Sequence, residues 1–371
     1  MHRAVDRVTS GRAHVYAVAA LIAATLGLPA CHSGSGDVCA PETTPWVSPS
    51  YAHSPPAPSD SPLTEESVSL GETLFFDTRL SGSGQTSCAS CHDPERAFTD
   101  GRARSIADDG ALTRRSAPSL VDVAYATTLT WANPLLRTLE DHALIPLFGE
   151  APREMASGEL RGDLMGRLQD DPALVSAFAV AYPCDAEPVT LARVADALAS
   201  YQRTLLSGRS RYDQHLAGAR DTLSAGELRG LALLESDRLA CTSCHLDFGR
   251  GAAREFHNTG VHTLAEYATQ DSGLFEHTYE PAHRGQFAVP TLRNITLTAP
   301  YMHDGSIPTL DAVLSHYAEP GSERTDALPG FALTEQERAD VLSFFHTLTE
   351  PLPSAQPQSA TPIAASLADA P

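Results

Sequence analysis

Two copies of one five-residue motif carry the chemistry that this sequence shows most directly. The copies are Cys88-Ala89-Ser90-Cys91-His92 and Cys241-Thr242-Ser243-Cys244-His245. Two thiols at this spacing can bond to both vinyl groups of one porphyrin, and the histidine that follows becomes an axial ligand of the iron. One copy alone could instead bind zinc or act as a redox dithiol. Two complete copies favour two covalently attached c-type haems, with His92 and His245 as iron ligands.

The composition is that of an acidic globular protein. The chain has 371 residues, 42% of them hydrophobic, and a formal net charge of -20 at pH 7. This length suits two domains of ordinary size. The negative charge argues against binding to nucleic acid or to an anionic membrane surface. It fits an exported protein with an ordinary acidic surface, or one that recruits a basic partner.

The first 30 residues have the pattern of a signal peptide. Basic residues precede an apolar stretch over residues 15–28, which is too short to span a bilayer comfortably. The stretch ends in Leu28-Pro29-Ala30-Cys31, which resembles a bacterial lipoprotein cleavage box. We therefore expect a periplasmic protein that a lipid on Cys31 anchors to a membrane. Simple cleavage near this position is the alternative.

The rest of the chain reads as a tether, two domains and a tail. Residues 31–62 are rich in Ser, Pro and Gly, which predicts a flexible tether, and residues 351–371 predict a disordered tail. Between them we expect an N-terminal haem domain over residues 63–215 and a C-terminal haem domain over residues 216–350, one around each motif.

Helical patterns precede both motifs. Apolar spacing predicts helices over residues 64–76 and 189–206, and capping boxes at Ser224 and Thr334 begin two more. An apolar helix followed by Cys-x-x-Cys-His thus occurs twice, and no run of alternating strands is present. The predicted fold is mainly α, with two cytochrome-c-like haem domains and long connecting loops.

Two cysteines remain after the motifs and Cys31 are assigned. Cys39 and Cys184 could pair in an oxidising compartment. The sequence does not show that they lie close enough, so both a disulfide and two free thiols remain open.

Several stretches resemble the bacterial di-haem cytochrome c peroxidase and MauG superfamily. They are the sequence from Leu70 to Cys91, Arg115-Ser116-Ala117-Pro118-Ser119-Leu120, Trp131, Pro290-Thr291-Leu292-Arg293-Asn294 and Ala299-Pro300-Tyr301-Met302-His303-Asp304-Gly305. The resemblance covers about residues 63–350. Within the superfamily, residues 130–140 look like the methanobactin-associated MbnH type, where peroxidases usually have Trp-Asp-Gly-Arg. The resemblance implies two haems c and hydrogen peroxide as the oxidant.

The resemblance assigns roles to two aromatic residues. Trp131 matches the tryptophan through which the family's two haems exchange electrons, and a plain core aromatic is the alternative. Tyr317 lies fourteen residues after His303, where MauG has a tyrosine and true peroxidases have a methionine. As sixth ligand of the C-terminal haem, a phenolate would favour oxidised iron, whereas a thioether favours reduced iron. The alternatives are that His316 or Met302 binds this iron.

The N-terminal haem is predicted to be open on its distal side. Many di-haem peroxidases close this haem with a histidine soon after the motif, but the chain has no histidine between His92 and Trp131. Cleavage of the peroxide O–O bond requires a group that moves a proton. Glu154 matches the family's glutamate of a Glu-Met pair, and His142 replaces the family's glutamine. A surface position is the alternative for His142.

The superfamily also binds calcium between its haem domains. Its ligands are an asparagine side chain, a threonine carbonyl and a proline carbonyl, together with waters. The matching positions are Ser116, Thr298 and Pro300. Ser116 offers a hydroxyl, which is a weaker oxygen ligand than an amide carbonyl. We expect Ca²⁺ at these residues.

The leading hypothesis is a MauG- or MbnH-like enzyme. Peroxide would react at the N-terminal haem, two oxidising equivalents would form a shared bis-Fe(IV) state through Trp131, and a residue on a partner protein would be oxidised. The MbnH resemblance implies oxidation of tryptophan to kynurenine in an exported copper-binding protein of MbnP type. The rivals are a di-haem cytochrome c peroxidase that takes electrons from a small cytochrome, and a di-haem electron carrier.

Overall fold

The structure is a computed structural model that describes most of the chain between residues 43 and 350. The described residues are 43–49, 52–59, 61–149, 153–155, 160–245, 248, 255–319 and 330–350. The chain divides into a unit of residues 1–39, which lies outside these ranges, and a unit of residues 40–371. The predicted signal peptide, Cys31 and the predicted tail therefore lie outside the described residues. Among the helices of the described part, none is long and apolar enough to cross a membrane.

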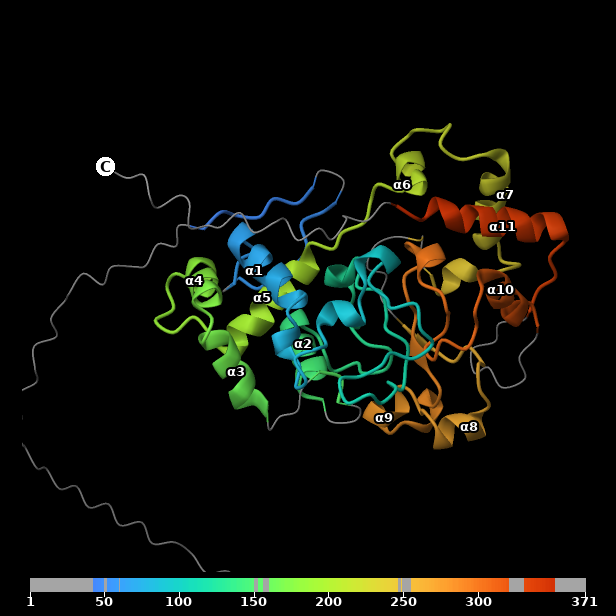
Figure 1. Cartoon of the computed structure of the whole chain (residues 1–371). Helices are drawn as coiled ribbons and strands as arrows, with labels where there is room; N and C mark the ends of the chain where they lie inside the picture. Colours follow the sequence, from blue (N-terminus) through green and yellow to red (C-terminus); the bar gives the residue numbers. More distant parts are fainter. Residues whose placement is uncertain are drawn as a thin grey trace, which may run out of the picture. The chain divides into compact units, whose positions relative to one another are not determined.

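Helices and long loops make up the second unit (Figure 1). The described helices are α1 (Glu65–Phe75), α2 (Leu139–Phe148), α3 (Arg161–Gln169), α4 (Pro172–Ala181), α5 (Leu191–Arg203), α6 (Arg211–Leu216), α7 (Ala225–Leu234), α8 (Leu264–Thr269), α9 (Phe275–Thr278), α10 (Leu310–Ala318) and α11 (Glu335–Thr347). Strands β1 (Phe256–His257) and β2 (Phe287–Ala288) pair antiparallel, with Phe256 opposite Ala288 and His257 opposite Phe287. The prediction of a mainly α fold is confirmed.

The first hydrophobic core forms around the crossing of α1 and α5. Helix α1 begins after Thr64, whose side chain accepts a hydrogen bond from the backbone N–H of Ser67. Gly71 lies where α1 meets α5, and a Cβ at this position would come within 1.9 Å of the carbonyl oxygen of Ala197. The two helices can therefore approach this closely only because residue 71 has no side chain.

The second core repeats this arrangement with α7 and α11. Both helices begin with the capping boxes that the sequence predicts, at Ser224 and Thr334. A Cβ on Gly230 of α7 would come within 2.2 Å of the carbonyl oxygen of Asp340 in α11. In each half of the unit, the helix that precedes a Cys-x-x-Cys-His motif thus uses a glycine to contact a later helix.

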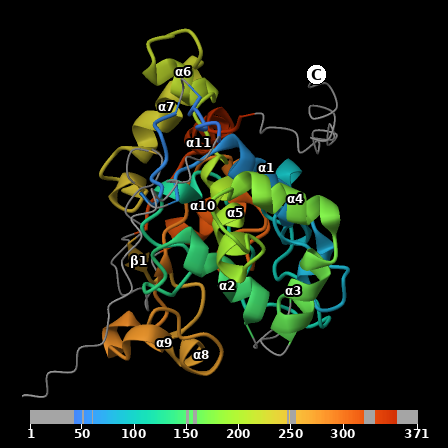
Figure 2. The ribbon, with the colours of Figure 1, turned by 90° about the vertical axis from the view of Figure 1, so that its left-hand side faces the viewer.

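The two cores follow one another in the sequence. The first ends at Leu205 and the second begins at Tyr212. Figure 2 shows α6 and α7 at one end of the second unit, with α8 and α9 at the opposite end. The domain limits at residues 63, 215 and 350 stay predictions.

Part of the segment that precedes α1 contacts the helices. The backbone N–H of Thr44 donates to the carboxylate of Glu66 at 3.0 and 3.1 Å. The Nε of Arg203 in α5 donates to the carbonyl of Pro56 at 2.9 Å. The described residues before α1 therefore lie against α1 and α5, although the sequence predicts a flexible tether here.

Cys184 lies after α4 and forms a disulfide. Cys39 lies outside the described residues, so the pairing of Cys39 with Cys184 stays a prediction.

Candidate haem and peroxide site

The first haem motif begins in a short 3-10 helix over Cys88–Ser90. The Nδ1 of His92 lies 2.8 Å from the carbonyl oxygen of Phe98, which leaves Nε2 available to an iron. Burial lowers the pKa of His92 and therefore favours the neutral, ligating imidazole. Burial also raises the pKa of Cys88 to about 12 and that of Cys91 to about 11. Each side chain thus suits covalent haem attachment better than thiolate chemistry.

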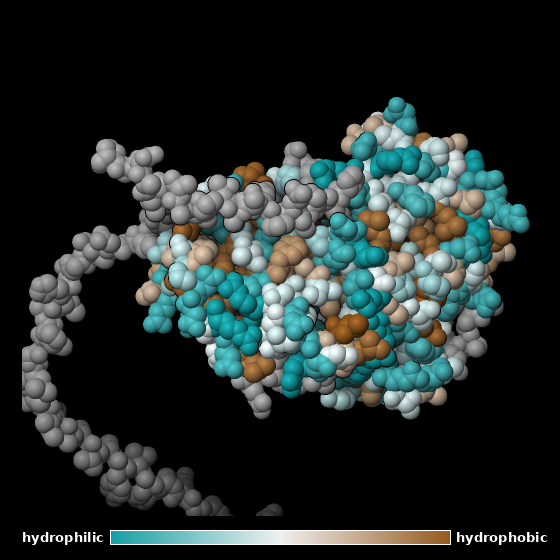
Figure 3. Space-filling view, in the orientation of Figure 1, coloured by the Kyte–Doolittle hydropathy of each residue, from teal (hydrophilic) through white to brown (hydrophobic). Residues whose placement is uncertain are grey.

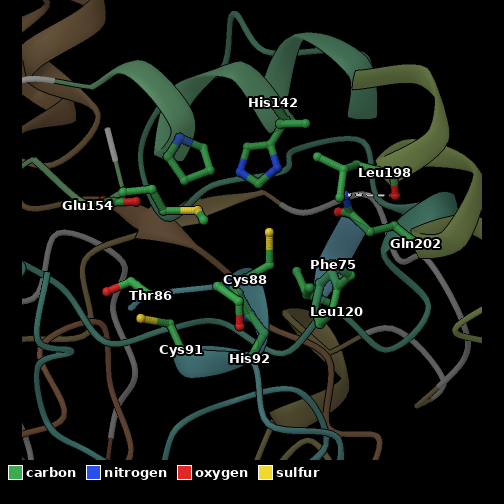
Figure 4. A pocket seen from close by; sticks show the side chains of 14 residues that line it. Phe75, Thr86, Cys88, Cys91, His92, Leu120, His142, Glu154, Leu198 and Gln202 are labelled. Atoms are coloured by element: carbon green, nitrogen blue, oxygen red, sulfur yellow. Dashed lines mark hydrogen bonds between the residues drawn. The ribbon is translucent and has the colours of Figure 1, made fainter. Parts of the chain in front are cut away.

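A cavity of about 580 Å³, part of it open solvent, lies over this motif. It is lined by Phe75, Thr86, Ser87, Cys88, Cys91, His92, Leu120, His142, Ala143, Pro146, Glu154, Met155, Leu198 and Gln202. Figure 4 shows His142 across the cavity from Cys88 and His92, with Glu154 at its side. An apolar wall, two thiols and a fixed imidazole fit a haem that His92 holds from one face.

Glu154 reaches the cavity from a loop that backbone hydrogen bonds hold in place. The carbonyl of Glu154 accepts from the N–H of Asp108 at 2.9 Å. The carbonyl of Met155 accepts from Gly82 at 2.7 Å, and its N–H donates to Pro146 at 3.1 Å. Burial raises the pKa of the Glu154 carboxyl, so this group holds a proton to higher pH than an exposed glutamate. A carboxyl in this state can both give and take a proton beside the iron.

His142 comes from α2, which begins after Thr138 as its N-terminal cap. His142, Ala143 and Pro146 follow helical spacing, so one face of α2 covers the cavity. Pro146 has no N–H to donate to the carbonyl of His142, and α2 continues through it to Phe148. The structure thus brings half-buried His142 and Glu154 to one cavity, and the role of His142 in proton transfer stays a prediction.

Gln202 also lines this cavity, although we did not single it out from the sequence. It lies on α5, is 6% exposed, and donates from Nε2 to the carbonyl of Leu198 at 3.2 Å. The sequence could have indicated Gln202 as a site residue, because it lies one helical turn after Leu198 and interrupts an otherwise apolar helix face.

The second haem motif has the same local construction. A short 3-10 helix covers Cys241–Ser243, and the Nδ1 of His245 lies 3.1 Å from the carbonyl oxygen of Pro290. Burial lowers the pKa of His245 to about 4 and raises that of Cys241 to about 12. The donor set again fits a covalently bound haem with His245 as its axial ligand.

Tyr317 lies on α10, which packs into the core beside this motif. Leu314, one turn earlier on α10, belongs to the same buried cluster as Leu239, with Cys241 packed against it. The Nε2 of His316 lies 2.9 Å from the carbonyl oxygen of Thr259, so this nitrogen is already engaged in the protein. This contact favours Tyr317 over His316 as the iron ligand, and that role for Tyr317 stays a prediction.

Trp131 connects the loops that contact the two axial histidines. Its indole Nε1 donates to the carbonyl of Ser116 at 2.9 Å, and its own carbonyl accepts from the N–H of Ala288 at 2.7 Å. The backbone of Pro118, two residues after Ser116, lies near the His92 ring. Pro290, two residues after Ala288, contacts His245. Trp131 is therefore held between the loop near His92 and the loop that contacts His245.

The loop before Ser116 is also bound to the C-terminal half by paired charges. Arg114 makes two contacts of 2.7 Å with the carboxylate of Glu276 in α9. Arg115 contacts the carboxylate of Asp271 at 2.7 and 2.8 Å. Bidentate pairs of this kind fix the orientation of the loop as well as its position.

The residues predicted to bind calcium lie on two neighbouring loops. The hydroxyl of Ser116 donates to the carbonyl of Met302 at 3.1 Å, two residues after Pro300. The hydroxyl of Thr298 instead donates to the carbonyl of Ile295 at 3.1 Å. Within the described ranges, no hydrogen bond joins Ser116 to Thr298 or Pro300, and the calcium site stays a prediction.

Known proteins with this arrangement are di-haem enzymes. A family model for the di-haem cytochrome c peroxidase matches residues 65–221, and a RoxA-like, cytochrome c-like model matches residues 286–322. The methylamine utilization protein MauG of Methylorubrum extorquens is 35% identical over 308 residues, which is 82% of this chain and 84% of that protein. The cytochrome-c peroxidase IdrP1 of Denitromonas iodatirespirans is 33% identical over 335 residues, 80% of this chain and 85% of that protein.

A solved structure shows the same fold. It is the crystal structure of a MauG-like protein associated with microbial copper homeostasis, with 41% sequence identity and a TM-score of 0.75. The match covers 82% of this chain and 95% of that chain. Together with the two motifs and the cavity over the first, these likenesses confirm two cytochrome-c-like domains, and the chain belongs to the di-haem cytochrome c peroxidase and MauG family.

Proposed function

We propose that this protein uses hydrogen peroxide to oxidise a residue on a partner protein. The observation that carries the proposal is the cavity over His92, where His142 and Glu154 lie together. The loop that would supply a closing histidine, residues 93–130, contains none. Peroxide can therefore reach the N-terminal haem in the resting protein, without a prior reduction that releases a ligand.

The protein contributes proton transfer at this site. A bound haem supplies the iron at which peroxide reacts. With a haem bound, Glu154, whose burial raises its pKa, would take a proton from one oxygen of hydrogen peroxide and return it to the other, which would leave as water. His142 lies on the same cavity and would donate a hydrogen bond to the peroxide.

Trp131 and Tyr317 then distribute the two oxidising equivalents. Trp131 is hydrogen-bonded to loops that contact both axial histidines, so it can carry an electron between the two haem domains. Tyr317 as an anionic ligand would favour the oxidised form of the C-terminal haem. A haem held by His245 would supply the redox centre on this side, so that a partner at the protein surface need not enter the peroxide cavity.

The proposed partner is an exported copper-binding protein of MbnP type, with tryptophan oxidised to kynurenine. The copper-binding class of partner is supported by the MauG-like structure associated with microbial copper homeostasis, and the oxidation of tryptophan follows from the resemblance of residues 130–140 to the MbnH type. Polar residues dominate the face in Figure 3, with apolar side chains in small groups. A polar partner surface would fit that face. The enzyme would act in the periplasm, with Cys31 as the lipid attachment site.

The test uses the fully oxidised holoprotein. Electron paramagnetic resonance should show one high-spin and one low-spin ferric signal, because one haem is open and the other has two protein ligands. Hydrogen peroxide should remove both signals together. Two low-spin signals at rest would contradict the open site. Mass spectrometry of the copper-binding partner after peroxide treatment should show conversion of one tryptophan. If no tryptophan is converted, the proposed partner is wrong, although the proposed reaction with peroxide still stands.

A second function, the reduction of H2O2 with electrons from a small cytochrome, is favoured by one observation. Several relatives are cytochrome c peroxidases, including IdrP1 at 33% identity. Steady peroxide turnover with a reduced small cytochrome, at a rate that exceeds partner oxidation, would support this alternative.

A further inference from the structure

Three side chains outside both haem motifs form a cluster with metal-ligand chemistry. They are His262, His303 and Asp304, and one possible ligand atom from each lies within 4.8 Å of the others. The Nε2 of His262 lies 2.8 Å from Oδ2 of Asp304. Two donors that share one zinc at about 2.1 Å lie about 3.0–3.4 Å apart, so these two atoms already have nearly the required separation.

His303 gives the cluster its unusual feature. It is 4% exposed, and its ring stacks on Phe287 with centroids 3.6 Å apart and planes 12° apart. In the described part of the chain, no hydrogen bond reaches either ring nitrogen of His303. The His262–Asp304 hydrogen bond uses two of the three groups, whereas a shared metal ion would use all three.

The backbone holds the three side chains in place. The carbonyl of His303 accepts from the N–H of Ser116 at 2.7 Å. Oδ1 of Asp304 accepts from the N–H of Ser306 at 3.0 Å, which leaves Oδ2 for the cluster. The backbone N–H of His262 donates to the hydroxyl of Tyr267 at 3.3 Å. The site therefore needs side-chain rotation, and no movement of a loop, to close around an ion.

Charge at the cluster also permits a cation. Arg115 lies 5.4 Å from the ring centroid of Phe287, but its guanidinium is neutralised by Asp271. Asp304 contributes one negative charge at the cluster itself. Two imidazoles and one carboxylate suit zinc or copper(II), whereas calcium and magnesium prefer sites made of oxygen.

We propose that His262, His303 and Asp304 bind one divalent transition-metal ion of the zinc or copper(II) class. The site uses three protein ligands and leaves a fourth position to water. It uses none of the residues of the two Cys-x-x-Cys-His motifs and shares no ligand with the predicted calcium site. The proposal does not depend on the reaction with peroxide.

The experiment measures zinc bound to the full-length, haem-loaded protein. After equilibrium dialysis against ZnCl2 and removal of loosely bound ions, elemental analysis should give one zinc per chain. The His262→Gln variant should bind zinc at least tenfold more weakly, and so should Asp304→Asn, which keeps an oxygen for Ser306. His346→Gln is the matched control, because His346 is exposed on α11 and should bind zinc as the parent does.

A second readout identifies the ligands. Copper(II) bound to the parent should show hyperfine splitting from two nitrogen nuclei, and His262→Gln should reduce this to one. Haem absorbance must be equal in all variants, which shows that each is folded and loaded. Zinc binding that is absent in the parent, or unchanged in both cluster variants, would overturn the proposal.

Discussion

The indole Nε1 of Trp131 donates to the carbonyl oxygen of Ser116 at 2.9 Å. The same Ser116 donates its backbone N–H to the carbonyl of His303 at 2.7 Å. The tryptophan is thus oriented by a residue that is bonded to both halves of the unit. Its ring plane is fixed by a directional contact and not only by packing, which matters because electron transfer depends on the relative position of donor and acceptor.

Replacement of this tryptophan should separate the two haems functionally. Trp131→Phe keeps an aromatic ring but loses the N–H donor, at a stability cost of about 1 kcal/mol. Haem content should remain that of the parent. Hydrogen peroxide should then consume only the high-spin ferric signal and leave the low-spin signal in place. Loss of both signals at the parental rate would mean that electrons use another route.

Replacement of Tyr317 tests the ligand of the second haem. Tyr317→Met substitutes a soft thioether for an anionic oxygen donor, which should raise the reduction potential of that haem. Partner oxidation should fall sharply, while peroxide turnover with an external reductant continues. Potentiometry and the low-spin resonance signal measure the change. A variant with the parental spectrum and parental partner oxidation would show that Tyr317 is not the ligand.

Removal of the carboxyl near the first haem should slow the peroxide reaction without unfolding the protein. Glu154→Gln keeps the shape but cannot move a proton, so we expect a rate about 10²- to 10⁴-fold lower. Stopped-flow absorbance measures this rate. Glu95→Gln is the control, since Glu95 is exposed and lies outside the cavity lining.

The free energy of unfolding of the same variant should also depend on pH differently from that of the parent. Burial raises the pKa of Glu154, so the folded protein holds this proton more tightly than the unfolded chain does. The resulting stabilisation is present below the unfolded pKa and is lost as pH rises through the folded pKa. Glu154→Gln should therefore lose less stability than the parent between acid and neutral pH, as thermal unfolding at a series of pH values would show. A steeper loss in the variant would contradict this account.

Substitution of glycine by alanine should destabilise the protein at Gly71 but not at Gly162. Gly71→Ala would place a Cβ 1.9 Å from the carbonyl oxygen of Ala197, so the crossing of α1 and α5 must open. We expect a loss of about 1–3 kcal/mol or more in the free energy of unfolding, with lower haem loading. Gly162→Ala on α3 is the control, because nothing lies within 4 Å of its Cβ. This control should gain about 0.5–1 kcal/mol from helix propensity.

Equal unfolding temperatures for the two alanine variants would contradict the proposed close contact. Gly230→Ala gives an independent check in the second core, where the Cβ would lie 2.2 Å from the carbonyl oxygen of Asp340.

Local patterns made much of the fold predictable. The sequence predicts helices over residues 64–76 and 189–206, and the structure has them at Glu65–Phe75 and Leu191–Arg203. Caps and apolar spacing act within a few residues, so a sequence displays them directly. The third and fourth predicted helices begin at their capping boxes, Ser224 and Thr334, for the same reason.

The candidate site was predictable only where a motif carried it. Glu154 and His142 came from a family resemblance, and the structure places both on one cavity. Gln202 had only a weak local signal on the apolar face of α5, and the cluster of His262, His303 and Asp304 has none, because separate loops bring it together. The two histidines of the cluster are forty-one residues apart, and no spacing rule connects them.

Main-chain hydrogen bonds hold the described residues around Glu154. Asp108, Gly82 and Pro146 all bond to the backbone of residues 154 and 155, and none of these bonds involves the Glu154 side chain. An engineer could therefore exchange the functional group at position 154 and keep its placement relative to the iron. Position 154 is therefore a place where an acid, an amide or an imidazole side chain could be substituted to change the chemistry at the first haem.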